Sequence, residues 1–476
     1  MSDQKNTSSP TGHWVNGCWT QWDGAQIAVE NPSNGQQIGS IPAGTAVDMD
    51  NAIAAAVKAR PAWSALTPAD RADVLDQVAD KLEARAEQVA ALIATDMGMP
   101  IKLAHMIQTN LPIGSFRIAA RLTRDFSFVR PIGNSRVIME PVGVVGCITP
   151  WNYPLHQIAA KAAFALAAGC AVVLKPSEIA PMAVVSLIEA TADAGLPAGL
   201  FNVVWGSGPD AGQRLAESAG IDLLSFTGST QTGRILSRIA GENLKRISLE
   251  LGGKSASLVL PGANFERAVK VSAGNCFINT GQTCSAWTRL LVERKDLDKA
   301  EDIAREVAAK NQAGDPFNPA TRIGPLVSAN QKNKVMDYIA KGIAEGATLI
   351  AGGKSPDGLT EGHFIEATVF SNVTRDMCIA QEEIFGPVLS IMAYDSVDEA
   401  IDIANDTPYG LAGAVWAKDQ RDAEEVARQI DSGQIDLNGG RFNPLAPFGG
   451  FKASGHGREN GSFGLDEFLE PKSLQY

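Results

Sequence analysis

Two short segments of this chain carry residue types that could together do covalent chemistry on a carbonyl group. Cys284 lies in a loop of mostly small residues, Gly281-Gln282-Thr283-Cys284-Ser285. Glu250 ends an apolar stretch earlier in the chain, close to the glycine pair Gly252-Gly253. A thiol nucleophile and a carboxylate that takes up protons are the minimum set for such chemistry. The sequence therefore predicts a covalent catalyst, provided that the fold brings the two segments together.

Each of these residues also has an ordinary structural explanation. An intracellular cysteine is most often a small core residue, and Glu250 could be an exposed carboxylate at a strand end. Asn152 stands between two aromatic residues, where an amide has few reasons to be except to donate hydrogen bonds. A hydrolase nucleophile would need a histidine partner, and no motif suggests one around His13, His105, His156, His363 or His456.

Composition narrows the class of protein. The 476 residues suffice for about three domains, and the 53 acidic against 41 basic residues give a net charge of −12, which argues against nucleic acid as a partner. The six cysteines include no Cys-x-x-Cys pair, so neither a metal site nor a disulfide framework is expected, and a reducing compartment is. Residues 1–10 are polar, unlike a signal peptide, and the apolar stretch 162–174 is too short to span a bilayer. We expect a soluble, cytoplasmic protein without a membrane partner.

The order of apolar and helical patterns predicts an α/β fold. From Val144 onward, short apolar runs at 144–149, 171–175, 201–205, 221–226 and 246–251 alternate with helical segments at 155–168, 180–194, 210–219 and 230–240. This alternation is typical of a parallel, doubly wound sheet, which binds ligands at the carboxyl ends of its strands. A second series, 255–260, 288–293, 388–394 and 412–416, predicts a second α/β domain.

The remaining elements are fewer. Thr67 followed by Pro68 is typical of a helix start, and the helical pattern behind it runs to about Gly98. An alanine-rich helix is expected near 51–60. Residues 126–140, interrupted by Pro131-Ile132-Gly133-Asn134, resemble a hairpin outside the first sheet.

Polar loops follow four of the predicted strands of the first sheet, at 149–154, 175–178, 226–230 and 250–253. All four loops should lie at the same edge of the sheet, the one formed by the carboxyl ends of its strands, so together they form a candidate binding site. Gly228 and Gly233 flank a turn into a helix, where backbone N–H groups could face a phosphate, or they merely end a strand. The Gly206-Ser207-Gly208 run departs from the dinucleotide fingerprint, and we interpret it as packing. Lys175 and Glu178 would suit ribose hydroxyls, or could form a surface ion pair.

Taken together, these segments resemble the NAD(P)-dependent aldehyde dehydrogenase superfamily. The matching segments appear in the family's order through most of the chain: 149–154, 175–178, 226–230, 249–254, 281–284, 382–387 and 447–452. Relatives that transfer the acyl group to coenzyme A generally lack the glutamate at position 250, so the resemblance is to the hydrolytic, non-acylating type.

The resemblance implies a mechanism. Cys284 would attack the aldehyde, and the side-chain amide of Asn152 with the backbone N–H of Cys284 would hold the oxyanion. The thiohemiacetal would pass hydride to the nicotinamide, and Glu250 would activate water to hydrolyse the thioester to the carboxylic acid. Lys161 and Glu459 match positions of a proton relay behind Glu250.

The resemblance also implies a cofactor site. Lys175 and Glu178 would hold the adenosine ribose, Gly228 and Ser229 would lie near the pyrophosphate, Glu383 would hold the nicotinamide ribose and Phe385 would back the ring. We expect NAD to be preferred, because Glu178 would repel a 2′-phosphate, with NADP also usable through Lys175. The expected set is Thr149, Pro150, Trp151, Lys175, Ser177, Glu178, Gly208, Phe226, Gly228, Ser229, Glu250, Leu251, Gly252, Cys284, Glu383 and Phe385.

The substrate is less defined. By resemblance, the aldehyde tunnel is lined by Tyr153, Gln157, Ala160, Phe442 and Phe448, with Trp287 nearby. Its aromatic lining would suit a medium-sized apolar or aromatic aldehyde. Arg441 could favour a carboxylated aldehyde at the tunnel mouth, or be a surface arginine.

The family fold implies three parts: a Rossmann-like cofactor domain (1–121 and 141–252), an α/β catalytic domain (253–467), and a small β oligomerisation element (122–140 and 468–476). Unpaired strand edges in that element would be covered by a partner subunit, so a homodimer or homotetramer is expected. A catalytically silent member of the family is the alternative, and the joint presence of Cys284, Glu250 and Asn152 argues against it.

Overall fold

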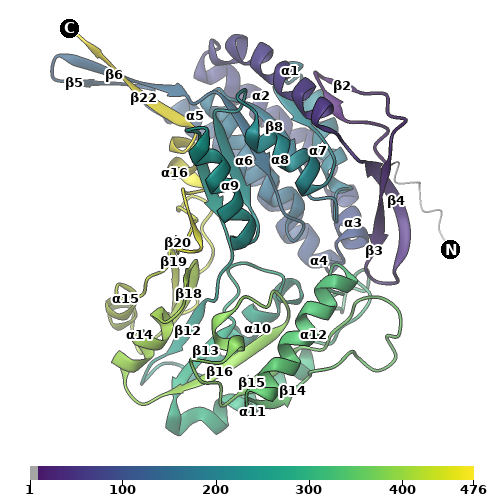
Figure 1. The fold of residues 1–476 in the computed structure, drawn as a ribbon. Helices are drawn as coiled ribbons and strands as arrows, with labels where there is room; N and C mark the ends of the chain where they lie inside the picture. The colour runs from purple at the N-terminus through teal and green to yellow at the C-terminus, as the bar shows by residue number, and fades with distance from the viewer. Residues whose placement is uncertain (1–8) are drawn as a thin grey trace.

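The computed structural model describes residues 9–476. Figure 1 shows two layered α/β parts, one above the other, and a narrow three-stranded arm that projects from the upper part and carries the C-terminus. Most of the polar segment 1–10, considered above as a signal peptide, lies outside the described residues. No helix within residues 9–476 is long and apolar enough to cross a membrane.

The largest sheet of the described chain has eight strands in the order β2-β1-β9-β8-β7-β10-β11-β21. Its five central strands are mutually parallel, which confirms the predicted doubly wound sheet. All five have a strand on each side; four are wholly buried and β11 is buried at its last three residues, as expected for parallel strands with both faces covered. The central strands are β7 (Val144–Ile148), β8 (Ala171–Lys175), β9 (Phe201–Val203), β10 (Leu223–Thr227) and β11 (Arg246–Glu250).

Helices cover this sheet where the sequence predicted them, with one exception. Segment 210–219 forms a π-helical turn, η2 (Gly208–Gly212), followed by the short helix α8 (Gln213–Glu217). The predicted helices between the strands are α6 (Pro154–Ala168), α7 (Ala183–Asp193) and α9 (Thr230–Glu242). Helix α6 is buried along nearly its whole length and ends at Gly169, whose φ of 101° allows a left-handed cap.

The single helix predicted from Thr67 to about Gly98 is wrong. The structure has α2 (Pro68–Glu83) and α3 (Ala86–Asp96), separated at Ala84-Arg85. The predicted start is confirmed, because the Thr67 side chain accepts a hydrogen bond from the Asp70 N–H. The helical pattern continues across the break, so nothing in the local sequence marks it. The other helices of this region are α1 (Ala46–Ser64), α4 (Ile101–Leu103), η1 (Ala104–Thr109, π-helical) and α5 (Asn110–Asp125).

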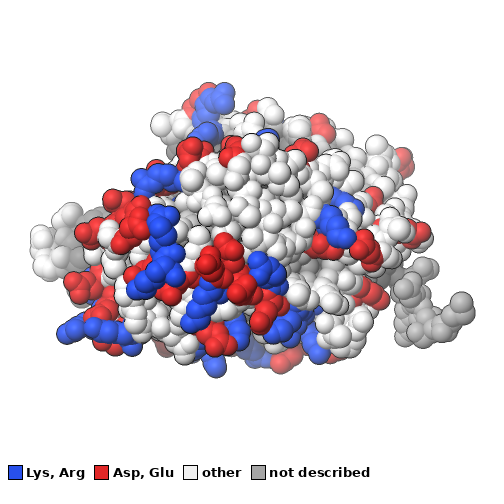
Figure 2. Space-filling view, turned by 90° about the horizontal axis from the view of Figure 1, so that it is seen from below, with Lys and Arg blue, Asp and Glu red and all other residues white. Residues whose placement is uncertain are grey.

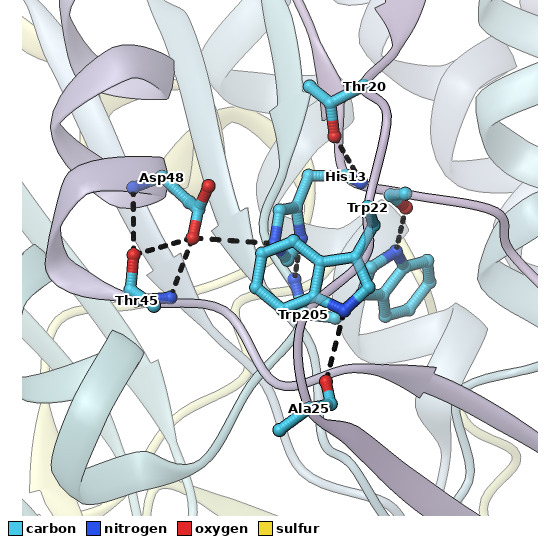
Figure 3. A network of polar contacts seen from close by, with 8 residues as sticks. His13, Thr20, Trp22, Ala25, Thr45, Asp48 and Trp205 are labelled. Atoms are coloured by element: carbon cyan, nitrogen blue, oxygen red, sulfur yellow. Dashed lines mark hydrogen bonds and ion pairs between the residues drawn. The ribbon is translucent and has the colours of Figure 1, made fainter.

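Strands near the N-terminus were not predicted. Two of them extend the first sheet and two form a separate hairpin: β1 (Trp14–Val15), β2 (Cys18–Trp19), β3 (Gln26–Asn31) and β4 (Gln36–Pro42). A polar network fixes this region (Figure 3). His13 Nδ1 accepts a hydrogen bond from the Trp205 N–H at 3.2 Å, and its Nε2 lies 3.7 Å from Asp48 Oδ2. Burial lowers the pKa of His13 more than Asp48 raises it, which favours the neutral ring that accepts this bond.

The lower part in Figure 1 contains a second sheet, with the order β14-β15-β16-β13-β12-β18-β19. The four predicted strands are confirmed as β12 (Ala256–Val259), β13 (Arg289–Glu293), β16 (Val388–Tyr394) and β18 (Ala412–Trp416). Three further strands join them: β14 (Thr348–Ala351), β15 (Thr368–Ser371) and β19 (Gln434–Leu437). The helical segments are α10 (Phe265–Phe277), η3 (Ile278–Gly281), η4 (Arg294–Asp296), α11 (Leu297–Lys310), α12 (Ala329–Ala344), α13 (Cys378–Gln381), α14 (Val397–Asn405) and α15 (Gln420–Ala427).

After the second sheet, the chain returns to the first. β21 (Gly455–His456) pairs antiparallel with β11 at the edge of the large sheet, and α16 (Gly461–Asp466) packs near α6. A two-stranded pair, β17 (Tyr409–Gly410) with β20 (Phe451–Lys452), precedes this return. Part of segment 253–467 therefore completes the sheet formed by the first half of the chain.

The projecting arm consists of β5 (Val129–Ile132), β6 (Ser135–Pro141) and β22 (Leu469–Gln475). The predicted hairpin at 126–140 is confirmed, and β6 pairs along its full length with the C-terminal strand. Val129, Ile132 and Tyr476 are more than half exposed on this arm.

Charges of both signs lie intermixed on the surface. The face in Figure 2 carries acidic and basic side chains side by side around an uncharged area, without a field of a single sign. This pattern agrees with a net charge of −12 that is spread over the surface.

Candidate active site

A pocket lies where the carboxyl ends of β7, β10 and β11 face residues of the second sheet's part. Loops after these strands form one side, and the Cys284 loop, helix α12 and the segment 383–385 form the other. Its lining consists of Pro150, Trp151, Asn152, Thr227, Gly228, Ser229, Glu250, Leu251, Gly252, Cys284, Gln331, Lys334, Glu383 and Phe385. The structure thus brings Cys284, Glu250 and Asn152 to one cavity, as the sequence predicted.

Cys284 is a half-buried free thiol that follows the short helical turn η3. Burial, with a smaller contribution from the nearby carboxylates of Glu383 and Glu250, raises the pKa of the Cys284 thiol to about 12. The resting sulfur is therefore protonated at neutral pH. Attack on a carbonyl needs a base that removes this proton.

Asn152 is fixed beside the cysteine loop by its side-chain amide. Its Nδ2 donates to the carbonyl oxygen of Gln282 at 3.1 Å. An amide nitrogen carries two hydrogens, so the second remains for a ligand in the pocket that Asn152 lines. Next to it, the Tyr153 hydroxyl lies 2.6 Å from Thr283 Oγ1, which ties the Asn152 loop to the Cys284 loop a second time.

Glu250 ends β11 and is 3% exposed. Neither of its carboxylate oxygens has a hydrogen-bond partner among residues 9–476. Burial raises the pKa of Glu250 well above its usual range, Glu459 raises it further, and Lys161 opposes the shift. A carboxyl group with a raised pKa and unsatisfied oxygens is suited to take up a proton near neutral pH.

A glycine makes room for this carboxylate. Gly449, in the segment 447–452, has a φ of 150°, and a Cβ added there would lie 2.6 Å from Glu250 Oε1. Any larger residue would displace the carboxylate, which explains why this glycine accompanies the glutamate in one site.

Lys161 and Glu459 form a buried ion pair on α6 and before α16. Both groups influence the pKa of Glu250, with opposite signs. Glu459 also exchanges two backbone hydrogen bonds with Phe448, at 2.8 and 2.9 Å. The structure therefore brings the two residues of the expected relay together and places their charges close enough to act on Glu250.

The expected nicotinamide end of the cofactor site lies at the same pocket. Glu383 Oε1 accepts a hydrogen bond from the Gly253 N–H at 3.1 Å, which orients its carboxylate. The rings of Trp151 and Phe385 meet edge to face, with centroids 5.4 Å apart. Ser229 caps α9 by accepting from the Thr232 N–H, so the positive end of this helix faces the pocket.

Other expected cofactor residues lie along the same sheet edge, outside that pocket's lining. Lys175 Nζ and Glu178 Oε2 are 2.8 Å apart, so the ion pair considered for them is present. Lys175 is 3% exposed, and the η2 turn that begins at Gly208 approaches its side chain through Gly212. The hydroxyl of Thr149 is buried without a partner in the described chain. The two others are Ser177, whose hydroxyl accepts from the Ile179 N–H, and Phe226, which is buried within β10.

The expected tunnel residues are brought together only in part. Tyr153, Gln157 and Ala160 lie on or just before α6, and all three are buried. Phe442 and Phe448 meet edge to face at 6.4 Å between ring centroids, with Phe442 43% exposed. The two remaining positions differ: Arg441 is exposed at the surface, and Trp287 is buried in the apolar core of the second sheet.

Sequence reasoning missed several residues that line the pocket. Thr227 follows Phe226 in β10, and neighbouring strand residues point to opposite faces of the sheet. Thr227 therefore lines the pocket, where Phe226 was expected. Gln331 and Lys334 come from α12, one turn apart. Gln331 Nε2 donates to the carbonyl oxygen of Phe385 at 2.8 Å. The helical spacing of these two residues was visible, but nothing local indicates which face of α12 meets the pocket.

Comparison with known proteins identifies the family to which this sequence is related. Residues 19–474 match the aldehyde dehydrogenase family. The chain belongs to the aldehyde dehydrogenase family. Within it, the chain is 46% identical over 464 residues to a 3-succinoylsemialdehyde-pyridine dehydrogenase from a Pseudomonas species, covering 97% of each protein. A putative aldehyde dehydrogenase from Staphylococcus haemolyticus is 41% identical over 466 residues, with 98% of each chain covered.

Solved structures agree with this assignment. The fold is similar to that of aldehyde dehydrogenase C from Pseudomonas syringae in complex with NAD+ and octanal, with a TM-score of 0.97, 41% identity, and coverage of 99% of this chain and 97% of the other. It is similarly close to an aldehyde dehydrogenase from Mycobacterium tuberculosis complexed with NAD+, with a TM-score of 0.96, 39% identity and 98% of each chain covered. The aldehyde dehydrogenase fold expected from the sequence is therefore confirmed.

Proposed function

We propose that this aldehyde dehydrogenase oxidises an aldehyde to its carboxylic acid with NAD, through a covalent intermediate on Cys284. The observation that carries the proposal is the convergence of Cys284, Asn152 and Glu250 on one pocket, which Glu383 also lines. A nucleophile, an amide donor and a poised carboxylate are the groups that this reaction needs.

In the acylation step, the Cys284 thiol gives up its proton to solvent water and the sulfur attacks the aldehyde carbon. Oxygen gains negative charge as the thiohemiacetal forms. The free N–H of the Asn152 amide and the backbone N–H of Cys284 stabilise this charge, a contribution worth about 3–4 kcal/mol per donor in comparable sites. The bound nicotinamide supplies the acceptor for the hydride.

In the deacylation step, Glu250 removes a proton from water, which attacks the thioester carbon and releases the acid. Its raised pKa makes it a better base than an ordinary surface carboxylate. Lys161 and Glu459 pass the proton away from Glu250 and set its pKa through their charges. The retained Glu250 supports water, rather than coenzyme A, as the acyl acceptor.

The residues fit a dinucleotide. Two buried hydroxyls without partners in the described chain, those of Thr149 and Thr227, lie at the sheet edge where the cofactor is expected. Lys175 and Glu178 would hold the adenosine ribose and Glu383 the nicotinamide ribose. Glu178 is one-third exposed, so it can face a ligand, and its charge supports NAD over NADP. The complexes of two structural relatives with NAD+ support the binding of NAD.

For the substrate we propose a medium-sized aldehyde with an apolar or aromatic body. The paired rings of Phe442 and Phe448 and the small side chain of Ala160 support it. It also agrees with the names of two relatives, one that acts on a pyridine semialdehyde and one solved with octanal.

For the assembly we propose a homo-oligomer formed through the projecting arm. Strand β5 carries the exposed apolar residues Val129 and Ile132, and it leaves one edge unpaired within the described chain. Such an edge is usually covered by a partner. This supports the domain division given above, with 122–140 and 468–476 as the oligomerisation element.

A panel of short aliphatic, long aliphatic, aromatic, carboxylated and amino aldehydes, each assayed with NAD and with NADP, tests the function. We expect NADH formation to be fastest with long aliphatic or aromatic aldehydes. Equal rates with NADP would contradict the cofactor preference, and no reduced cofactor with any aldehyde would contradict the function itself.

A further inference from the structure

Asn279 occupies an unusual position just before the nucleophile. It is 1% exposed and lies in η3, between α10 and Cys284. Its φ of 53° and that of Thr280, 58°, are left-handed, as is that of Gly281, 71°. Three consecutive left-handed residues are rare outside glycine-rich turns, and a β-branched threonine in this region is strained. The chain therefore maintains a costly backbone shape immediately before Cys284.

Neighbouring contacts hold this turn in place. Thr280 Oγ1 donates to the carbonyl oxygen of Gly324 at 3.0 Å. A Cβ at Gly281 would lie 2.1 Å from the carbonyl oxygen of Gly386, so only glycine permits this close approach. The Thr280 hydrogen bond ties the turn to Gly324, and the missing side chain of Gly281 lets the turn pack closely against the backbone at Gly386.

The side chain of Asn279 links the two segments that supply the oxyanion donors. Its Nδ2 donates to the backbone carbonyl of Asn152 at 3.0 Å and to the carbonyl of Gln282 at 3.3 Å. The same Gln282 carbonyl accepts from Asn152 Nδ2 at 3.1 Å. One buried amide thus fixes Asn152 from its backbone and fixes the peptide that leads to Cys284.

Gln282 also holds Asn279 in place through hydrogen bonds. Its backbone N–H and its Nε2 both donate to the carbonyl oxygen of Asn279 at 3.1 Å, and its Oε1 accepts from the Val327 N–H at 2.9 Å. Asn279 is therefore bonded through both its side chain and its backbone. A left-handed position also explains the residue type, because asparagine tolerates this backbone better than other residues with a side chain that donates hydrogen bonds.

We propose that Asn279 is a positioning residue that holds the Asn152 amide and the Cys284 backbone N–H in the relative orientation needed to bind the oxyanion. The inference rests on the proposed function, since it assumes attack by Cys284. Asn279 touches neither substrate nor cofactor in this scheme and acts through the two donors. A displacement of about 1 Å in such a group slows a reaction by about a hundredfold.

The test compares a step that needs the oxyanion donors with one that does not. In Asn279→Gly and Asn279→Asp the left-handed backbone is retained but the amide N–H groups are lost. We expect the burst of NADH in the first turnover with octanal to slow by about 10- to 100-fold. Alkylation of Cys284 by iodoacetamide forms no oxyanion, and its rate should stay within about twofold of wild type. Asn372→Asp is the matched control, an exposed asparagine with a φ of 52°, and should leave both rates unchanged.

A double variant separates positioning from general loosening. When Asn152→Ala is combined with Asn279→Gly, we expect less slowing than the product of the two single effects, because both act on the same oxyanion. A wild-type burst in both Asn279 variants, equal slowing of burst and alkylation, or a double effect equal to the product would each overturn the inference. Cys284→Ala distinguishes a failure of the proposed function from a failure of the inference on Asn279. NADH formation that survives in this variant refutes the proposed function, whatever the Asn279 variants show.

Discussion

The buried ion pair of Lys161 with Glu459 offers a prediction that links stability to catalysis. The two side chains are 1% and 9% exposed. Replacing Lys161 by methionine keeps the volume but leaves the Glu459 carboxylate without its partner. Removing one member of a buried pair costs about 3–5 kcal/mol of folding stability. The double variant Lys161→Met with Glu459→Gln removes both charges, so it should regain most of this loss in a urea or thermal unfolding experiment.

The same pair acts on the pKa of Glu250 with opposite signs. Lys161 lowers that pKa and Glu459 raises it. Glu250 must lose its proton to act as the base in deacylation, so the rate rises with pH as the carboxyl ionises. In Lys161→Met the pKa of Glu250 should rise and this limb of the pH profile should move to higher pH. In Glu459→Gln the pKa should fall and the limb should move to lower pH.

The assay is the steady-state rate of NADH formation across the pH range in which the wild-type rate rises. Lys270→Met is the control, since Lys270 forms an exposed pair with Glu266 on α10, and it should leave stability and the pH limb unchanged. Shifts of both limbs in the same direction, or no shift in either variant, would refute the reasoning. So would a double variant that is less stable than Lys161→Met alone.

Four further predictions concern Glu250, Glu178 and Arg441. Glu250→Gln should preserve the first-turnover burst of NADH while slowing steady turnover by about a hundredfold or more, and loss of the burst would mean that Glu250 is needed to activate the thiol. Because burial raises the folded-state pKa of Glu250, its ionisation costs stability as pH rises above the unfolded-state pKa, so the thermal stability of Glu250→Gln relative to wild type should increase with pH. Glu178→Gln should improve kcat/KM for NADP relative to NAD by about tenfold, equivalent to about 1.4 kcal/mol of relieved repulsion, and an unchanged ratio would remove Glu178 from cofactor selection. Arg441→Ala should affect all aldehydes alike if Arg441 is a surface residue, as its exposure indicates, whereas a higher KM for carboxylated aldehydes alone would place it at the tunnel mouth.

Those parts of the fold that depend on local pattern could be predicted from the sequence. Buried parallel strands appear as short apolar runs, so β7, β8 and β11 were located to within a residue or two. The edge rule for parallel sheets then placed Glu250 beside Asn152 without any knowledge of side-chain contacts. Cys284 could be assigned to the same pocket only through resemblance, because the cysteine loop belongs to the second sheet's part and no local signal states where it docks.

The features that could not be predicted from the sequence depend on contacts between distant segments. β21 pairs with β11 across about 200 residues, and the two strand residues of β21 have no pattern that announces a strand. Asn279 reads as an ordinary loop residue until its left-handed backbone and its bonds to Asn152 and Gln282 are seen. Gln331 and Lys334 lie on an amphipathic helix whose orientation is set by tertiary packing. Trp287 shows the converse, since the resemblance placed it near the tunnel and the structure buries it in a core.

The most direct test of the account is the position of the covalent intermediate. Glu250→Gln protein, in which the thioester should accumulate, is mixed with octanal and NAD, quenched in acid and mapped by mass spectrometry. We predict an added octanoyl group on the peptide that contains Cys284, present in an amount equal to the NADH of the burst, and absent when Cys284 is replaced by alanine. An octanoyl group on another residue, or a full burst of NADH without any acyl peptide, would contradict the central role of Cys284.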